Sequence, residues 1–416
     1  MLDVAARHGY AGASVARVVE HSGLSRQAFY RHYAGREDCF RAAYRSAAAE
    51  IGGRLRDAVR RSTPAERPEA TIAALLSALE DRPAAVRMLF VDAVGACAAV
   101  REEHQRQLRG IEGSVERFLR SPGAPALHLP AVALLGGVTG VLSARILSGE
   151  ADAGSDLLSG LGAWVRSYEG ADAHAPVWWG EGWLGPPPGR PPGGPPPPSE
   201  VQLLPRGRSA LPAALAGDAR CSRILDATVR QVAARGYANL TVADIVADAR
   251  VPRAAFYTHF AGKQDAFLAA QTRGLRESIA AASSEFATGR SWPERVWLGI
   301  AALLDYLASH PDLTRVCLLE SAAAGQTAVT RIAENRGAYA IFLADGYRQR
   351  PGVCLPPPLG SEATIAAIEA IVRAYLLAGD AGRIREALPQ CAYVALAPFI
   401  GPEEAISWVE KALAGA

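Results

Sequence analysis

The sequence predicts an all-α protein built from two tandem copies of one helical unit. Three observations support this fold class. In the 416-residue chain, residues 236–270 match residues 9–43 without gaps at an offset of 227, and about half of these positions are identical; later segments match at an offset of 230. Apolar residues recur at helical spacing in both halves, and no alternating strand pattern is present. A segment rich in proline and glycine, residues 185–199, separates the halves and cannot bury a core.

These observations divide the chain into five parts. Each half is expected to contain a small N-terminal helical domain, here called the head, and a larger helical domain, here called the body. We expect the first head at residues 1–45, the first body at 46–170, a linker at 171–217, the second head at 218–275 and the second body at 276–416. The chain is long enough for two or three domains, because a domain commonly holds about 100–200 residues. About fifteen extended linker residues reach on the order of 45 Å, which lets the two bodies lie side by side.

Each head is expected to begin with a helix. In the second head, residues 222–235 place apolar side chains on one face, and Gly236 is a typical residue to end the helix. In the first head Met1 aligns with Thr228, so the counterparts of residues 224–227 are missing. Two explanations stay open: the natural start lies upstream, or the first head lacks its first helical turn.

Two short helices follow in each head. Ser14 and Thr241 are suited to cap helices at residues 15–22 and 242–249, because their hydroxyls accept hydrogen bonds from free backbone N–H groups. A break of three residues then precedes a third helix, which starts at Arg26 or Arg253. Arg250 replaces the first-copy turn glycine, Gly23; if the backbone there has positive φ, a non-glycine residue costs about 1 kcal/mol.

Two short helices joined by a tight turn, the second of them polar, form a helix-turn-helix, which sets one helix in the DNA major groove. The first copy reads Gly9-Tyr10, then Ser14-Val15, then Gly-Leu-Ser-Arg-Gln-Ala-Phe-Tyr-Arg-His-Tyr over residues 23–33. It resembles the DNA-binding head of the tetracycline-repressor (TetR/AcrR) family of transcriptional regulators. The second copy resembles that head equally well, and both contain Phe-Tyr-x-His-[Tyr/Phe]-x-Gly-[Arg/Lys].

The resemblance implies a role for each polar residue of the heads. Tyr30 with His32, and Tyr257 with His259, correspond to the family's phosphate clamp; a core or capping role for the histidines is the alternative. Arginines at the start of the third helix can read guanine, and Gln27 can read adenine. The candidate DNA-binding residues are Ser14, Arg17, Ser25, Arg26, Gln27, Tyr30, Arg31, His32 and Arg36 in the first head, and Thr241, Arg253, Ala254, Tyr257, Thr258, His259 and Lys263 in the second.

Charge agrees weakly with this interpretation. The net charge of the chain is +2, yet residues 1–50 hold seven arginines against five acids, and residues 218–275 hold eight basic against five acidic residues. The heads therefore carry +2 and +3, and the remaining segments together carry −3. Arg17, Gln27 and Arg31 become Asp244, Ala254 and Thr258 in the second copy. We therefore expect the two heads to prefer different bases.

In the family the bodies hold an effector cavity and the helices that pair two subunits. The resemblance implies an apolar or aromatic effector near Met88, Phe90, Cys97 and Phe118, and near Tyr306, Cys317, Tyr339 and Phe342; the alternative is that these side chains only fill the core. Pairing helices are expected at about residues 131–148 with 155–168, and 361–378 with 383–397. Gly136, Gly137 and Gly140 would permit close helix approach, or would mark a local notch in the core.

Other protein classes find little support. The six cysteines are scattered without metal-ligand spacing, so we expect no metal and no cofactor. Residues 121–144 carry no Asp, Glu, Lys or Arg, but their prolines leave about fifteen helical residues where a membrane span needs about twenty, which favours a buried helix. The start of the chain does not read as a secretory signal. An enzyme is the weakest hypothesis, because no catalytic motif is present and no catalytic residue is predicted.

The sequence therefore predicts a cytoplasmic bacterial transcriptional regulator, interpreted as a ligand-responsive repressor that binds double-stranded operator DNA through two non-identical heads. It acts as an intramolecular pseudo-dimer or as a homodimer, without a membrane. The alternative from another class is a ligand sensor or protein-interaction scaffold of the same family that does not bind DNA. Activation rather than repression, the operator sequence and the effector stay open.

Overall fold

The computed structural model describes residues 1–119, 127–149, 154–170, 213–349, 355 and 358–415. Within these ranges the chain forms helices and no strand, apart from one isolated β-bridge between Leu127 and Glu169. The all-α prediction is confirmed. The proline- and glycine-rich part of the expected linker lies outside the described residues. Helix α10 (Ala213–Arg235) begins nine residues before the helix expected at 222–235, inside the segment that the sequence assigned to the linker.

The two halves share one order of main helices, to which the second half adds short 3-10 helices and a final helix, α19. The first half contains α1 (Leu2–Gly12), α2 (Val15–Ser22), α3 (Arg26–His32), α4 (Arg36–Arg61), α5 (Arg67–Asp81), α6 (Pro83–Arg87), the π-helix η1 (Met88–Asp92), α7 (Ala98–Leu119), α8 (Ala131–Ser148) and α9 (Gly154–Arg166). The second contains α10, η3 (Tyr237–Asn239), α11 (Val242–Ala249), α12 (Arg253–Tyr257), α13 (Lys263–Phe286), α14 (Trp292–Ser309), α15 (Pro311–Arg315), the π-helix η4 (Val316–Glu320), α16 (Gln326–Tyr339), η5 (Ala340–Phe342), η6 (Ala344–Arg348), α17 (Leu359–Leu377), η7 (Ala381–Ala387), α18 (Leu388–Ile400) and α19 (Pro402–Gly415).

The first helices of the two heads end in the same way. Gly9 has φ +66° and its counterpart Gly236 has φ +76°, a region that glycine enters without a Cβ clash. Gly9 therefore interrupts α1, and only its first seven residues form a regular helix, whereas α10 has 23 residues before Gly236.

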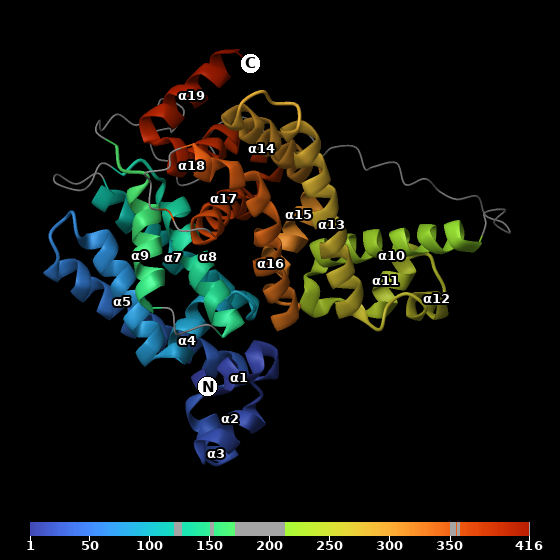
Figure 1. Cartoon of the computed structure of the whole chain (residues 1–416). Coiled ribbons are helices and arrows are strands. Elements are labelled where there is room, and N and C mark those ends of the chain that lie inside the picture. Colours follow the sequence, from blue (N-terminus) through green and yellow to red (C-terminus); the bar gives the residue numbers. More distant parts are fainter. Residues whose placement is uncertain (120–126, 150–153, 171–212, 350–354, 356–357, 416) are drawn as a thin grey trace.

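The two bodies pack against each other through the helices expected to pair. Helix α8 of the first half lies along α17 of the second (Figure 1). A Cβ atom on Gly136 would lie 2.2 Å from the Cβ of Ala370, and one on Gly140 would lie 2.5 Å from that of Ala366. These two glycines permit the close approach of α8 and α17. Gly137 has a different role, because its face meets the ring of Trp164 within the first half.

Hydrogen bonds from two buried aromatic residues of the first half also join it to the second half. The indole N–H of Trp164 on α9 donates to the Thr364 hydroxyl at 3.1 Å, and the Tyr168 hydroxyl donates to the Val394 carbonyl at 2.9 Å. Trp164, Tyr168 and Thr364 are fully buried. Because buried polar groups without partners are costly, these bonds favour one register between the halves.

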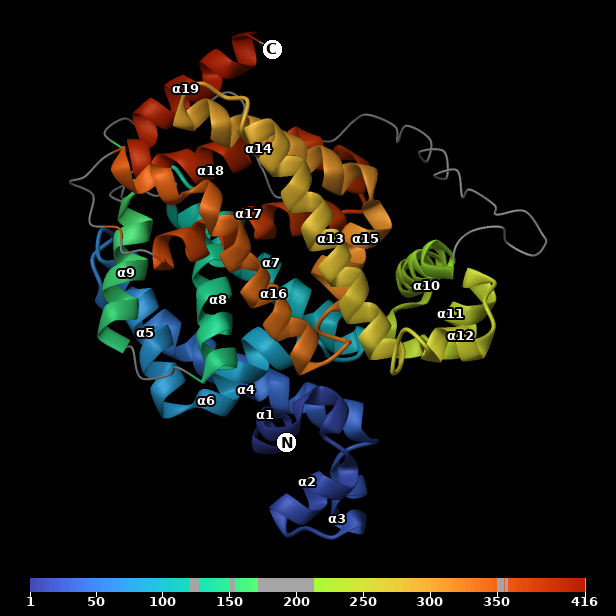
Figure 2. The same ribbon diagram turned by 45° about the vertical axis from the view of Figure 1, so that its right-hand side comes forward.

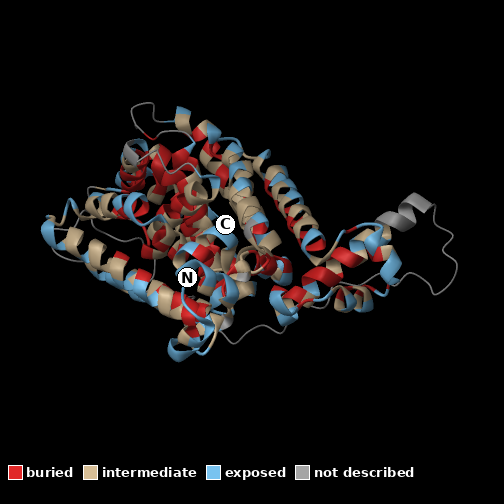
Figure 3. Cartoon of the chain, turned by 90° about the horizontal axis from the view of Figure 1, so that it is seen from below, coloured by how far each residue is buried: buried red, intermediate tan, exposed pale blue. Residues whose placement is uncertain are grey.

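The heads project from the paired bodies. In Figure 1 the first head, α1–α3, lies at the bottom and the second, α10–α12, lies to the right; the turned view of Figure 2 keeps them apart. Buried residues gather in the paired bodies when the molecule is seen from below (Figure 3). The core of the first head is continuous with that of the bodies, whereas the second head has a separate core that it shares with α15 and η4.

One helix among the described residues, α8, is long and apolar enough to cross a membrane by length and composition alone. Its glycine face is covered by α17, and Val141 and Leu142 are buried. The helix is thus part of the interface between the halves, which agrees with the buried helix expected there.

Candidate nucleic-acid interface and effector cavity

The turn of each helix-turn-helix has left-handed backbone geometry. Gly23 has φ +68° and ψ +8°, and Arg250 has φ +53° and ψ +46°. Among the described residues Arg250 is the one non-glycine residue with positive φ. The left-handed conformation at this position is therefore imposed by the fold of the head, and the second head forms it with an unfavourable residue type.

The expected caps are present. The Ser14 hydroxyl accepts the N–H of Arg17 at 3.3 Å, and the Thr241 hydroxyl accepts the N–H of Asp244 at 3.2 Å. Ser25 caps α3 by accepting the N–H of Ala28 at 3.1 Å. Its counterpart Pro252 makes no side-chain cap, and α12 has five residues where α3 has seven.

The two proposed phosphate clamps have nearly the same geometry. Tyr30 is 57% exposed and Tyr257 48%, although each ring stands edge-on against a buried phenylalanine, Phe29 or Phe256, at 5.3 and 5.4 Å. Such exposure is unusual for a large aromatic side chain. A tyrosine that rests on the core with its hydroxyl in solvent can donate to a phosphate oxygen.

The other polar candidates of the recognition helices also face solvent. His32 and His259 are exposed, which excludes the core role that was the alternative for them. Exposed too are Arg17, Ser25, Arg26, Gln27, Arg31, Thr241, Arg253, Ala254 and Thr258, whereas Ser14, Arg36 and Lys263 are half-buried. The Arg253 guanidinium lies 5.7 Å from the centre of the Tyr257 ring, so the two share one patch.

Arg36 and Lys263 have an internal role that the sequence analysis did not assign. The Arg36 guanidinium lies 4.5 Å above the ring of Tyr10, and the Lys263 ammonium lies 4.7 Å above that of Tyr237. Lys263 also donates to the carbonyls of Tyr237 and Leu240, at 3.3 and 2.9 Å, and burial lowers its pKa. Both cations therefore hold the start of the long helix against the head, and a phosphate contact by them stays a prediction.

The start of α11 differs from that of α2 in charge. Asp244 accepts the hydroxyl and the N–H of Thr241, at 2.6 and 3.0 Å, and Arg235 pairs with it at 2.8 Å. Hydrogen bonds from Thr241 lower the pKa of Asp244, so the carboxylate stays ionised. An anion at a helix N-terminus competes with phosphate for the free N–H groups. A phosphate contact of the Thr241 hydroxyl is therefore weakened, because this hydroxyl already donates its hydrogen to Asp244. Among the hydrogen bonds of the described residues, the Ser14 hydroxyl only accepts, from the N–H of Arg17, so its hydrogen can be donated to a phosphate.

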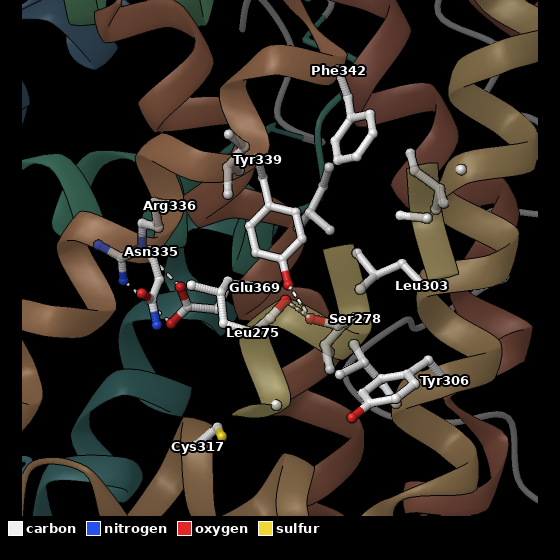
Figure 4. Close-up of a pocket in the computed structure, with 18 of the residues that line it drawn as sticks. Leu275, Ser278, Leu303, Tyr306, Cys317, Asn335, Arg336, Tyr339, Phe342 and Glu369 are labelled. Carbon is white, nitrogen blue, oxygen red and sulfur yellow. Dashed lines mark hydrogen bonds and ion pairs between the residues drawn. The ribbon is translucent and has the colours of Figure 1, made fainter. Parts of the chain in front are cut away.

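The second body contains a cavity of about 180 Å³ between α13, α14, α16 and α17. The four residues expected near an effector there, Tyr306, Cys317, Tyr339 and Phe342, all line it (Figure 4). Burial raises the pKa of Cys317 to about 12, so its thiol stays neutral. The walls are mostly apolar, which suits a ligand of low polarity.

Polar groups gather at one end of this cavity. Arg336 donates to both carboxylate oxygens of Glu369, at 2.7 and 3.2 Å, and Figure 4 shows this pair beside Asn335. Burial alone would raise the pKa of Glu369, but the guanidiniums of Arg336 and Arg373 outweigh burial and lower it. The Tyr339 and Ser278 hydroxyls lie 2.7 Å apart. The sequence did not reveal Arg336, Glu369 and Ser278, because a polar residue on the surface of a helix and one on the wall of a cavity occur at the same spacing in the sequence.

The first-body candidates do not share a cavity. Met88 is fully buried in the core, and Phe90 lines a separate cavity between the halves. Cys97 lines a pocket beside α4, and the Phe118 ring lies 5.3 Å from the Arg67 guanidinium. Among the described residues these four side chains therefore do not line one common cavity, and an effector site at them stays a prediction.

Comparison with known proteins agrees with the motif. A family model described as bacterial regulatory proteins of the tetR family matches residues 2–43 and again residues 224–270. No curated protein matches the chain.

Solved structures also match. The fatty acid degradation regulator FadR from Bacillus halodurans is 16% identical to this chain; the match covers 42% of this chain and 94% of FadR, with a TM-score of 0.39. A TetR family regulator from Marinobacter aquaeolei VT8 is 18% identical; the match covers 47% of this chain and 97% of that regulator, with a TM-score of 0.33. A TetR-like regulator from Rhodococcus sp. RHA1 is 19% identical; the match covers 50% of this chain and 100% of that regulator, with a TM-score of 0.32.

The family match falls on both helix-turn-helix heads, and each match contains the exposed tyrosine and histidine of the recognition helix. The chain is therefore a tandem TetR-like regulator, which carries the DNA-binding domain of the tetR family twice in one polypeptide.

Proposed function

We propose that this chain is a cytoplasmic, ligand-responsive repressor that binds an asymmetric operator with its two different heads. The observation that carries the proposal is the contact between the effector cavity and the second head. Cys317, on the cavity wall, lies one helical turn before Glu320, whose carboxylate accepts the backbone N–H of Tyr237 in that head at 2.9 Å. A ligand that displaces η4 would therefore change the position of the head.

Two further bonds support the same coupling. Gln271 lines the cavity and donates to the Ser321 hydroxyl, and Gln264 donates to the Ala324 carbonyl at 3.0 Å. The segment from 316 to 325 thus contacts both the cavity wall and α13, the helix that leads out of the second head. An effector acts on an equilibrium only by binding one position of this segment better than another.

We also propose that one chain acts as the pair that other regulators build from two subunits. Support comes from the contacts of α8 and α9 with α17, which occupy the pairing helices within the chain. A single chain then presents two heads to DNA, with half-sites about one helical turn or a little more apart. Because the heads differ at Arg17, Gln27 and Arg31, the preferred operator would be asymmetric.

The test begins with selection and sequencing of genomic DNA fragments that the full chain binds. Gel shifts on a selected fragment then compare Tyr30→Ala and Tyr257→Ala with the Tyr30→Phe and Tyr257→Phe controls, which keep the ring and remove the hydroxyl. We expect each alanine variant to weaken binding about tenfold, with a smaller loss for each phenylalanine variant. A footprint on a perfect palindrome together with a sedimentation mass of two chains would exclude the single-chain arrangement.

The sensor or scaffold that does not bind DNA is the second candidate. The carboxylate of Asp244 at the start of α11 favours it. If no genomic fragment is enriched, and salt-dependent binding stays at background with both heads intact, the scaffold is the better explanation. Ligand response is tested separately with N-phenyl-1-naphthylamine, a neutral apolar fluorophore. We expect it to bind the parent chain and not Leu303→Trp, which fills the cavity.

A further inference from the structure

A second cavity, of about 130 Å³, lies between the halves. Its first-half wall comes from η1, α7 and α8, with Phe90 and Leu108 among its apolar residues. Its second-half wall comes from η4, α16 and α17. It shares Arg336 and Glu369 with the effector cavity, but the rest of its polar lining is its own. Neither body alone forms this space.

The charges of this cavity do not balance. Arg336 and Arg373 both bond to Glu369, the Arg373 guanidinium at 2.5 Å, so two cations share one carboxylate. His104 also lines the cavity, and burial, followed by the charge of Arg373, lowers its pKa to about 4. His104 is therefore neutral at pH 7. The neighbouring ion pair of Arg145 and Glu362, at 3.1 Å, adds no net charge.

The hydrogen bonds of the two arginines differ. Arg336 is committed, because its third contact is the Gly140 carbonyl of α8 at 3.2 Å. Arg373 is committed through one nitrogen only; its Nε–H is buried and meets no acceptor among the described residues. The Arg373 side chain is 36% exposed, so its charge is partly hydrated and only the Nε–H is cut off from solvent. A buried donor without an acceptor is unfavourable unless a ligand satisfies it.

We propose that the cavity between the halves binds a small organic anion, with one carboxylate on Arg373 and a short apolar tail among Phe90, Leu108 and Leu319. The net charge of one guanidinium selects a monoanion over a neutral molecule or a dianion. Because the walls belong to both halves, the bound anion joins them and stabilises their packing. This site shares the Arg336–Glu369 pair with the proposed effector cavity but adds Arg373 and the walls of the first half, whereas the effector cavity lies wholly within the second body and has balanced charges.

The test uses the full chain and two probes of six carbon atoms each, sodium hexanoate and hexan-1-ol, in isothermal titration calorimetry. We expect hexanoate to bind with one site per chain and hexan-1-ol to bind at least about tenfold more weakly, because a charge-assisted hydrogen bond is lost. Arg373→Gln should weaken hexanoate by about tenfold or more. Arg348→Gln is the matched control, since it removes an equal charge from a side chain that is 83% exposed.

Two further variants locate the site independently of Arg373. Ala333→Leu fills this cavity from α16 and should abolish hexanoate binding, whereas Leu303→Trp fills the effector cavity and should leave it unchanged. Circular dichroism melting of each variant shows whether it folds. The proposal is overturned if millimolar hexanoate does not bind the parent chain, if Arg373→Gln and Ala333→Leu bind it normally, or if Leu303→Trp removes binding. None of these outcomes depends on DNA binding, so they are distinct from a failure of the proposed repressor function.

Discussion

The carboxylate of Glu320 accepts a hydrogen bond of 2.9 Å from the backbone N–H of Tyr237, and this bond joins the second body to its head. Glu320 ends the π-helix η4, as Asp92 ends the π-helix η1 in the first half. Asp92 is one methylene shorter and lies 3.5 Å from Arg87 instead. The two halves thus use the same position differently, because the longer side chain reaches a head and the shorter one stays inside its body.

Removal of the Glu320 carboxylate should loosen the second head. Glu320→Ala leaves the N–H of Tyr237 without its acceptor, and a lost partner of this kind costs about 1–3 kcal/mol. We expect faster hydrogen exchange at the Tyr237 amide and a lower urea midpoint, with partial recovery in Glu320→Gln, which keeps an acceptor. Unchanged exchange at Tyr237 would show that the bond does not couple the body to the head.

Asp92 should make the stability of the first body depend on pH. Burial raises the pKa of Asp92 to about 7, with a smaller opposing effect from Arg87. The folded state therefore binds the proton more tightly than the unfolded state. The stabilisation is fully present below about pH 4 and is lost as the pH rises through about 7.

Asp92→Asn removes this dependence. Its free energy of unfolding should exceed that of the parent chain by an amount that grows between about pH 4 and 7, to on the order of a few kcal/mol. Urea titrations at several pH values measure the difference. Glu102→Gln, at an exposed position of α7, is the control and should show no such trend. A difference independent of pH would contradict the raised pKa of Asp92.

Relief of the left-handed arginine should stabilise the second head. Arg250→Gly places glycine where φ is +53°, and we expect a gain of about 1 kcal/mol in the free energy of unfolding. Arg250→Ala keeps the Cβ atom and should give no gain. In the first head, Gly23→Ala should cost a similar amount. Equal stabilities of the glycine and alanine variants at position 250 would argue against backbone strain.

The charge of Asp244 should limit the affinity of the second head for DNA. Asp244→Asn keeps an acceptor for Thr241 and removes the negative charge from the start of α11. The comparison is made in a chain whose first head is weakened by Tyr30→Ala. There we expect Asp244→Asn to bind DNA several-fold more tightly at low salt and with a steeper salt dependence, because a charge that repels phosphate is lost. Asp248→Asn, at the other end of α11, is the matched control. No change in affinity would place α11 away from the phosphates.

Close approach of α8 and α17 should make Gly136 intolerant of any side chain. Gly136→Ala puts a methyl group 2.2 Å from the Cβ of Ala370, so the helices must separate, at a cost of about 1–3 kcal/mol. Gly110→Ala, on exposed α7 with open space around it, should instead be neutral or stabilising by up to about 1 kcal/mol. Thermal melting compares the two variants; equal effects would mean that the halves do not pack closely in solution.

Sequence by itself determined what depends on local geometry and on repetition. The caps at Ser14 and Thr241 and the left-handed turn at Gly23 and Arg250 follow from residues within a few positions of each other. The repeat then predicts two heads, because the same local pattern occurs twice. The close approach at Gly136 and Gly140 could also be predicted, since small residues one turn apart leave one helix face bare.

Only the tertiary structure decided what depends on contacts between distant segments. Periodicity cannot tell that Lys263 holds the carbonyls of its own head, that Gly137 faces Trp164, or that Arg373 shares Glu369 with Arg336. It also cannot tell a core residue from one that lines a cavity, because Met88, which is fully buried, and Cys317, which lines a cavity, lie on similar apolar helices. A cavity is set by how the volumes of many side chains add up across helices, and that sum exists only in the packed molecule.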